Sequence, residues 1–189
     1  MIRQAEMADF GAITHIREST ALEVSRIQDP EYRVEIERRG FLLPSGLSVE
    51  DFQTSIASYD VAEREGQVIG YVRLTEEQDM LPSTKAFWYR PDIKDVYYAN
   101  PHAYIWGIGV LPEASHHGVG TEMLQAAERQ VQAKNIPWLF SEIVIAPVTN
   151  IASMLFHEKN GFERIALQEP TQAHGMEGFQ NLVYGKPLP

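Results

Sequence analysis

The chain has 189 residues, of which 44% are hydrophobic and 22% charged, so it can bury a sizeable core. Its 16 Lys and Arg against 26 Asp and Glu give a formal net charge of −10, which argues against nucleic acid or an anionic membrane as the main partner. The absence of Cys excludes disulfides, thiolate nucleophiles and Cys-based zinc sites.

The N-terminal third of the chain predicts a short strand followed by three helices. Asp9 is a helix start that precedes apolar residues at helical spacing. Pro30 suits the first turn of the second helix and Gly40 suits its end, while Ser48 is the expected N-cap of the third. The expected ranges are residues 1–5 for the strand, a start at Asp9 for the first helix, 29–40 for the second and 48–59 for the third.

The middle of the chain changes to strand patterning. Two apolar runs on either side of Gly66 predict a β-hairpin over residues 60–74. Residues 76–102 are rich in Pro and aromatic residues and are too long for a turn, so we expect an inserted excursion there. Residues 103–110 are apolar almost throughout, which predicts a strand in the centre of a sheet.

The C-terminal half alternates helices with strands. Helices are expected over residues 119–134 and 150–161, and strands over 138–146, 162–167 and 179–188. On the later helix, Ala152, Leu155 and Phe156 are expected to face the core. No repeat or linker divides the chain, so the order of elements predicts a single domain over residues 1–189 with mixed α/β layers.

The first residues of the chain and the lengths of its apolar runs indicate which cellular location to expect. The start, MIRQAEMADF, lacks the apolar region of a signal peptide. No apolar run approaches the ~20 residues that a membrane-spanning helix requires. We therefore expect a soluble, cytoplasmic protein.

The stretch SHHGVGTEML, residues 115–124, joins a predicted strand to a predicted helix through a glycine-containing turn. Gly118 and Gly120 allow close approach to the backbone, and the helix start adds unpaired N–H groups and the positive end of its dipole. The turn is therefore a candidate anion site, with an ordinary tight turn as the alternative. Two nucleotide motifs fail, because no Lys follows Gly120 and Met123 stands where a dinucleotide loop has its third Gly.

Two sequence blocks here resemble the GNAT family of N-acetyltransferases, which use acyl-CoA. The family patterns are V-x-P-x-x-(R/Q)-x-x-G-x-(G/A) and, downstream, N-x-x-(A/S)-x-x-(F/L)-Y-E-K-x-G-F. The matching residues are Val110, Pro112, Ser115, Gly118 and Gly120 in the first block, and Asn150, Ser153, Phe156, His157, Glu158, Lys159, Gly161 and Phe162 in the second. The resemblance implies an α/β fold with a mixed, mostly antiparallel central sheet flanked by helices, the acyl-CoA N-acyltransferase fold.

The resemblance also implies a binding mode for acetyl-CoA as co-substrate. Its pantetheine would lie along the strand that ends at Val110, whose backbone N–H would face the thioester carbonyl, and its pyrophosphate would lie on the N–H groups of the turn. The implied contacts are Ile108, Gly109, Val110, Ser115, His116, His117, Gly118, Val119, Gly120, Thr121, Asn150, Ser153 and Phe156.

The glycine turn departs from the family pattern at two positions. Ser115 stands where Arg or Gln is usual, and His116 stands where a small residue is common. Because backbone N–H groups do most of the phosphate binding, we expect the anion site to survive. His116 and His117 then either add positive charge or lie exposed without a role. A metal site is not expected, because adjacent loop histidines point apart and no third ligand is evident.

Three residues are candidates for the chemistry: His157, Tyr104 and Glu142. The resemblance places His157 beside the CoA sulfur, where an imidazolium would be a stronger acid than the family's usual Tyr; the alternative is that it only fills space. For the base, Tyr104 stands near the family's usual Glu but has an ordinary pKa near ~10. A water chain ending on Tyr104, Glu142 or His102 is an alternative. An outward-facing edge charge is an equal alternative for Glu142, so no single base is assigned.

The resemblance implies direct transfer of an acyl group, most simply acetyl, from acetyl-CoA to a primary amine in a ternary complex. The alternative is a non-catalytic acyl-CoA-binding module with the same fold. The acceptor site is expected in residues 22–47 and 76–102, where aromatic residues either wall it or form a satellite core. Those aromatic residues are Trp88, Tyr89, Tyr97, Tyr98 and, nearby, Trp106. The acidic composition weakly favours a cationic acceptor. We expect no metal, nucleic acid or membrane partner. The resemblance to the family implies a possible homodimer through the late strands.

Overall fold

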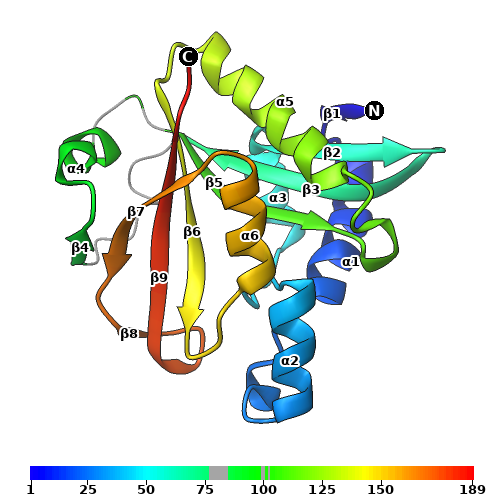
Figure 1. The fold of residues 1–189 in the computed structure, drawn as a ribbon. Coiled ribbons are helices and arrows are strands. Elements are labelled where there is room, and N and C mark those ends of the chain that lie inside the picture. The colour runs from blue at the N-terminus through cyan, green and yellow to red at the C-terminus, as the bar shows by residue number, and fades with distance from the viewer. Residues whose placement is uncertain (77–84, 99–100, 102) are drawn as a thin grey trace.

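The structure is a computed structural model of the chain, and it describes residues 1–76, 85–98, 101 and 103–189. The strands are β1 (Ile2–Gln4), β2 (Tyr59–Arg64), β3 (Gln67–Thr75), β4 (Ala86–Trp88), β5 (Ala103–Val110), β6 (Trp138–Ala146), β7 (Glu163–Gln168), β8 (Thr171–Ala173) and β9 (Met176–Pro187). They form one sheet in the order β1-β2-β3-β5-β6-β9-β7-β4, with β8 paired to β9 (Figure 1). Only β5 and β6 pair in parallel among the described strands.

Helices cover both faces of this sheet. The helices are α1 (Phe10–Thr20), α2 (Pro30–Arg39), α3 (Val49–Ser55), α4 (Pro91–Tyr97), α5 (Val119–Ala133) and α6 (Ile151–Lys159). Figure 1 shows α5 and α6 on one face and α1 and α3 on the other. The predicted fold class, a mixed and mostly antiparallel sheet flanked by helices, is confirmed.

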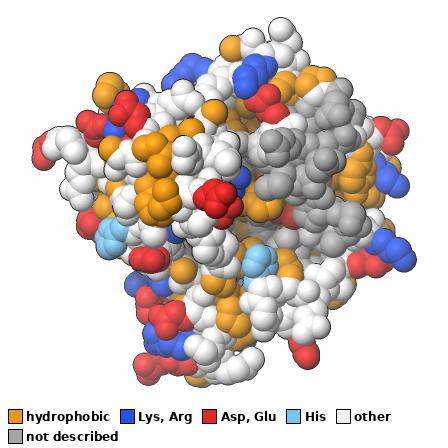
Figure 2. Space-filling view, turned by 180° about the vertical axis from the view of Figure 1, so that it is seen from behind, with side chains coloured by type: hydrophobic (Ala, Val, Ile, Leu, Met, Phe, Trp, Pro, Cys, Tyr) orange, Lys and Arg blue, Asp and Glu red, His pale blue; other side chains and the backbone are white. Residues whose placement is uncertain are grey.

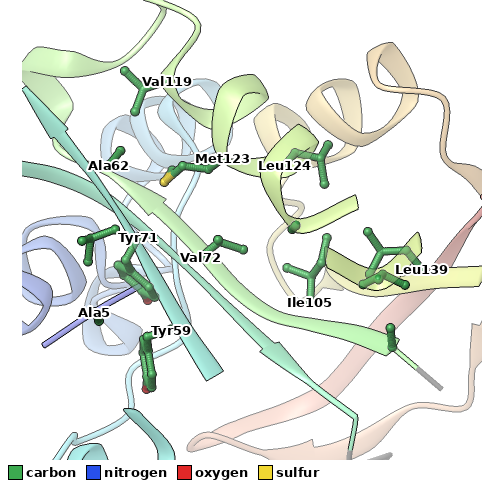
Figure 3. Close-up of a cluster of buried hydrophobic side chains, with 14 of the residues drawn as sticks. Ala5, Tyr59, Ala62, Tyr71, Val72, Ile105, Val119, Met123, Leu124 and Leu139 are labelled. Carbon is green, nitrogen blue, oxygen red and sulfur yellow. The ribbon is translucent and has the colours of Figure 1, made fainter. Parts of the chain in front are cut away.

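Two glycines let these helices pack closely on the strands. A Cβ at Gly70 would lie 2.9 Å from Cε of Met123 on α5, and a Cβ at Gly109 would lie 3.1 Å from Cγ2 of Ile16 on α1. Figure 3 shows Met123, Leu124 and Val119 of α5 lying over β3 and β5. A side chain at either position would require its neighbours to shift within a core that is already close-packed.

The turn and cap residues behave as their chemistry predicts. Asp29 caps α2 by accepting a hydrogen bond from the N–H of Glu31 at 3.0 Å, and Pro30 occupies the first turn. The β2–β3 hairpin turns at Glu65 and Gly66, whose φ angles of 52° and 78° are the positive values that a two-residue turn of this hand needs. The hairpin predicted around Gly66 is therefore confirmed.

Some element boundaries and contents differ from the sequence-based expectation. The helix predicted over 48–59 ends at Ser55, because a single 3-10 turn follows and Tyr59 already begins β2. The insertion predicted over 76–102 contains β4 and α4, and its residues 77–84, 99, 100 and 102 lie outside the described residues. Leu155, expected in the core, is 61% exposed, because α6 buries His157 instead.

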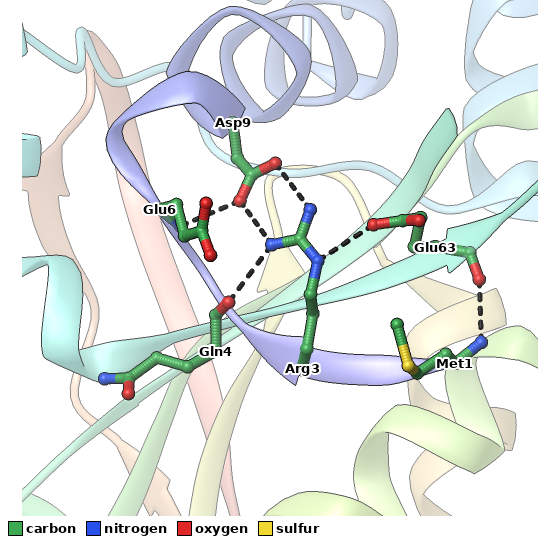
Figure 4. A network of polar contacts seen from close by, with 6 residues as sticks. All are labelled: Met1, Arg3, Gln4, Glu6, Asp9 and Glu63. Atoms are coloured by element: carbon green, nitrogen blue, oxygen red, sulfur yellow. Dashed lines mark hydrogen bonds and ion pairs between the residues drawn. The ribbon is translucent and has the colours of Figure 1, made fainter. Parts of the chain in front are cut away.

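A polar network ties the N-terminal strand to the hairpin. The guanidinium of Arg3 donates to both carboxylate oxygens of Asp9, at 2.7 and 2.9 Å, and to Glu63 at 2.8 Å (Figure 4). Asp9 also accepts from the backbone N–H of Glu6. These bonds hold the pKa of Asp9 below its ordinary value of 3.8, chiefly through Arg3.

The feature that positions the functional site is a split between β5 and β6. The two strands pair only where Ala103 to Ile105 of β5 meet Leu139 to Ser141 of β6. A β-bulge in the β3–β5 pairing falls at Trp106, because Arg73 pairs with Gly107 while Leu74 pairs with Ile105. Beyond this bulge β5 stays with β3 and diverges from β6, as Figure 1 shows.

Candidate active site

A cavity of about 530 Å³ lies at the split between β5 and β6. Its walls come from residues 105–110 of β5 and 141–144 of β6, from the starts of α5 and α6, and from the segment 39–45. The segment 39–45 belongs to the region 22–47, where an acceptor site was predicted. The volume is in the range of small-molecule sites.

The open edge of β5 presents backbone groups to this cavity. The N–H of Leu111 donates to the carbonyl of Ile69 on β3, at 2.9 Å. Backbone groups alternate between the two sides of a strand, so the N–H groups of Val110 and Ile108 point away from β3 and toward the split. Gly109 points its backbone toward β3, and Tyr71, at 3.0 Å from a built Cβ, fills its side-chain face. Gly109 was predicted as a CoA contact, but packing against Tyr71 accounts for its identity.

The glycine turn leaves a run of unpaired backbone donors. Glu122 is the first residue of α5 whose N–H bonds back into the helix, to the carbonyl of Gly118. Within the described chain, no protein acceptor pairs with the N–H groups of residues 116–121. Gly118 has a φ of 82° and His116 a φ of 65°, a backbone shape that turns successive N–H groups to one side. The turn therefore has the geometry of an anion site at a helix N-terminus.

The side chains of the turn contribute less than its backbone. Ser115 donates its hydroxyl to the carbonyl of Leu111 at 3.2 Å, and Val119 is buried in the core. His116 and His117 are exposed, and no group of three or more potential metal ligands occurs in the described part of the chain. Gly120 is explained by packing, since a Cβ there would lie 3.2 Å from the ring of Phe156.

The start of α6 lines the cavity, but its polar side chains already have partners. Asn150 is the N-cap of α6: its Oδ1 accepts from the N–H of Ser153 at 3.2 Å, and its Nδ2 donates to the carbonyl of Phe41 at 2.7 Å. Asn150, Ser153 and Phe156 all border the cavity. The second sequence block therefore fastens α6 to the segment 39–45 as well as facing the predicted CoA site.

His157 lies inside the protein among aromatic rings. It is 1% exposed, and the rings of Phe156, Phe162 and Tyr184 surround it. Its Nδ1 donates to the carbonyl of Ser153 at 2.8 Å, so its Nε2 carries a lone pair and has no partner in the described residues. Burial lowers its pKa from 6.5 to about 4. The predicted imidazolium acid does not fit this environment, because the ring is neutral at pH 7 and its nitrogen without a partner cannot donate a proton.

Glu142 lies on β6 at the cavity and is held by a polar network. Tyr97 donates to its Oε1 at 2.8 Å, and Asn181 donates to its Oε2 at 3.0 Å. Desolvation raises the pKa of Glu142 above 4.5, and hydrogen bonds from Tyr97, Gln168 and Asn181 partly oppose that rise. The alternative of an outward-facing edge charge is therefore wrong. The partners Asn181 and Gln168 carry no local sequence signal, because they reach Glu142 from β9 and β7 only in the folded sheet.

Tyr104 borders the same cavity and is 6% exposed. Its burial, with the nearby charge of Glu142, raises its pKa well above 10, so the hydroxyl keeps its proton at pH 7. Tyr104 therefore cannot act as a base at neutral pH. His102, the third predicted end of a water chain, lies outside the described residues.

Most of the predicted aromatic wall packs elsewhere. Trp88 contacts Tyr97 and Tyr98 at ring distances of 5.5 and 5.8 Å, and Tyr97 contacts Phe140 at 5.0 Å. The rings of Trp88, Tyr97 and Phe140 belong to a satellite core over β6, β7 and β9, which was the alternative interpretation. Among the five aromatics, Trp106 is the one that the described cavity lining includes.

Charged residues on the described surface are of both signs. Figure 2 shows acidic and basic side chains interspersed with hydrophobic ones on the face that it presents. The charge balance of the cavity lining differs from that of the whole chain, whose net charge is −10. Arg17 and Arg39 contribute two cations to the described lining, and Glu142 is its one carboxylate. Neither arginine was singled out in the sequence. Of the described helices, none has the length and apolar character needed to cross a membrane.

Solved structures share this fold over the whole chain. The ribosomal-protein-alanine N-acetyltransferase from Brucella melitensis matches with 21% identity and a TM-score of 0.65, covering 100% of this chain and 99% of that one. The PaiA N-acetyltransferase from Thermoplasma acidophilum, in complex with coenzyme A, matches with 16% identity and a TM-score of 0.62 over 99% and 98% of the two chains. The protein smu.2055 from Streptococcus mutans UA159 matches with 16% identity and a TM-score of 0.68 over 100% and 99%.

Sequence comparison assigns the family. No curated protein matches the chain. The model of the acetyltransferase (GNAT) family matches residues 21–162, which include the split strands, the glycine turn and α6. The chain therefore belongs to the acetyltransferase (GNAT) family.

Proposed function

We propose that the chain, acting as a single domain, transfers an acetyl group from acetyl-CoA to a primary amine by direct attack within a ternary complex. The observation that carries this proposal is the open edge of β5. It leaves the N–H groups of Ile108 and Val110 facing a cavity that Ser115 and Gly120 of the turn also line. Among the described residues, the N–H groups of residues 116–121 have no protein acceptor. An extended pantetheine with a pyrophosphate at its end has the shape and charge that this arrangement suits.

The residues of the site fit such a co-substrate. The backbone donors of the turn would hold the pyrophosphate, and the edge of β5 would pair with the pantetheine amides. The N–H of Val110 would donate to the thioester oxygen as negative charge develops there. Phe156 and the start of α6 would border the pantetheine on the side away from β5.

Glu142 is the residue that we assign as general base. A carboxylate whose pKa is raised toward neutrality accepts a proton from an ammonium more effectively than an ordinary one. In the proposed reaction Glu142 takes a proton from the acceptor ammonium, and the free amine attacks the thioester carbon. The new C–N bond forms and the C–S bond breaks. The second proton, which the attacking nitrogen loses as the amide forms, goes to the departing sulfur, so CoA leaves as the free thiol. The neutral, buried His157 borders this site as packing and as a hydrogen-bond acceptor.

Two measurements test the proposal. Acetyl-CoA should raise the melting temperature, whereas ATP and NAD should not, because the turn lacks the Lys of a Walker loop and the third Gly of a dinucleotide loop. Release of CoA thiol should then require both acetyl-CoA and a primary amine.

The outcomes separate the competing functions. Stabilisation by acetyl-CoA without thiol release for any primary amine would favour a non-catalytic acyl-CoA-binding module. No stabilisation by any acyl-CoA would overturn the proposal entirely.

A further inference from the structure

Two charged groups of opposite sign line the cavity, Glu142 on β6 and Arg17 on α1. We propose that the amine acceptor is a zwitterion, and that Arg17 binds its carboxylate while Glu142 and Asn181 bind its ammonium. This inference rests on the proposed function and names the acceptor class for that same site. It replaces the expectation of a cationic acceptor, which followed from the net charge of the whole chain and not from the charges in the cavity.

Arg17 is a cation that borders the cavity and has no anionic partner among the described residues. Its Nη2 donates to the carbonyl oxygen of Ser45 at 3.0 Å and to the hydroxyl of the same residue, and the hydroxyl of Tyr71 is a further neighbour. These partners are neutral oxygens. Among the described residues Arg17 makes no ion pair, whereas Arg39, in the same cavity, is paired with Glu35 at 3.1 Å.

A guanidinium in this situation suits a carboxylate ligand. It has five N–H donors in a planar fork, and its neighbours here use only part of them. A carboxylate accepts two of these bonds side by side, which makes such pairs stronger than neutral ones. The contact with Ser45 also fixes the direction of the side chain, since Ser45 borders the cavity as well.

The side of the cavity formed by β6 and β9 has acceptors suited to an ammonium. Asn181 is 7% exposed and borders the cavity. Its Nδ2 donates a hydrogen bond to Glu142, and its Oδ1 is a buried acceptor that has no partner among the described residues. A buried acceptor without a hydrogen bond is costly unless a ligand supplies the donor. Glu142 provides the negative charge beside it. An ammonium has three donors and can satisfy both groups at once.

The two charged groups lie on opposite sides of the split. Tyr71 Oη, beside Arg17, lies 3.6 Å from a Cβ built at Gly107 on β5, so Arg17 reaches the cavity from the β5 side. Glu142 lies on β6, one residue beyond Ser141, which pairs with Ile105. An acceptor that lies across the split can therefore meet Arg17 with its carboxylate and Glu142 with its ammonium.

The test compares matched acceptors and matched variants. The acceptors are the common L-amino acids and the carboxamide of each, which keeps the amine and removes the negative charge. Arg17→Gln removes the proposed anchor, and Arg129→Gln, an exposed arginine of α5 without an ion pair in the described chain, is the control. Thiol release from acetyl-CoA gives kcat and KM, and calorimetry gives the acetyl-CoA affinity.

We expect the best amino acid to exceed its carboxamide by at least about tenfold in kcat/KM, because a site built to bind a charged group rejects the analogue that lacks it. Arg17→Gln should reduce that ratio to near one, mainly through KM, with the acetyl-CoA affinity unchanged. Arg129→Gln should behave as the parent protein. Carboxamides that react as well as the acids, or a preference that survives in Arg17→Gln, would overturn the inference.

A failure of the proposed function gives a different result. If no amine releases thiol, calorimetry of the same amino acids still measures binding to the protein with CoA present. Amino-acid binding that Arg17→Gln abolishes and the carboxamides lack would then support the carboxylate site without the reaction. Equal binding of acids and amides, or no binding of either, would reject it.

Discussion

Replacing Glu142 with Gln tests the assignment of the general base. Gln has nearly the same shape, and its amide oxygen can still accept from Tyr97, while the amide of Asn181 can turn to accept from the new N–H₂. The polar network is therefore retained and the capacity to take a proton is lost. Any loss of activity then reports the chemistry and not a collapsed site.

The expected loss of rate follows from what the cavity contains. General base catalysis typically contributes about 10²- to 10⁴-fold, which corresponds to about 2.7–5.4 kcal/mol of activation free energy. Glu142 is the one carboxylate in the described lining. We therefore expect kcat of Glu142→Gln to fall by about a hundredfold or more, with little change in acetyl-CoA affinity.

The same variant has a predicted effect on stability. The pKa of Glu142 in the folded state lies above its ordinary value of 4.5, so the folded protein binds this proton more tightly than the unfolded chain does. The stability contributed by this group therefore falls as pH rises between the two pKa values. Gln carries no such penalty, and Glu142→Gln should be at least as stable as the parent protein at pH 8.

The assay is thiol release across a pH series, with urea unfolding in parallel. In the parent protein kcat/KM should rise with pH through the raised pKa of Glu142, and the variant should lose that limb. Glu177→Gln, an exposed position on β9, is the matched control. A kcat for Glu142→Gln within about threefold of the parent value, against the expected hundredfold, would refute the assignment.

Three further substitutions test other parts of the structure. For His157→Gln we expect kcat to fall less than about tenfold, because the neutral ring is no acid. The free energy of unfolding of the parent protein should fall by roughly 3 kcal/mol between pH 6.5 and 4, because the folded pKa of His157 is about 4 and the unfolded chain binds the proton first. Urea unfolding should show that this pH dependence is absent in the variant. Gly120→Ala places a Cβ 3.2 Å from Phe156, and calorimetry should show weaker acetyl-CoA binding, whereas unchanged affinity would mean that the turn and α6 do not meet at the site. Asp9→Ala removes two hydrogen bonds from Arg3 and should lower the free energy of unfolding, measured in urea, by about 2 kcal/mol. Because the folded pKa of Asp9 lies below 3.8, the parent protein should lose this contribution as pH falls through that folded value. A variant as stable as the parent protein would show that the network does not stabilise the fold.

Much of the fold was predictable because its signals are local. The hairpin at Gly66, the central strand over 103–110 and the helix after the glycine turn each rest on a few neighbouring residues. The insertion was not predictable in the same way. β4 is three residues long and is stabilised by pairing with β7, far away in the sequence.

In the candidate site too, the features with a local sequence signal were predictable and those that depend on the folded sheet were not. The glycine turn could be recognised because a helix N-terminus and its preceding glycines are contiguous in sequence. The setting of His157 could not, since helical spacing places it on a face without saying whether that face meets solvent, CoA or aromatic rings. Arg17, Gln168 and Asn181 come from α1, β7 and β9, and only the folded sheet brings them to one cavity.

The most direct test of the central claim is an amide NMR titration of the 21.4 kDa protein with acetyl-CoA. We expect the largest chemical-shift changes on the N–H groups of residues 116–121 and on those of Ile108 and Val110. Gly109 should change less, because its N–H points toward β3. Changes centred elsewhere on the sheet, or saturation without any change at residues 116–121, would contradict that claim.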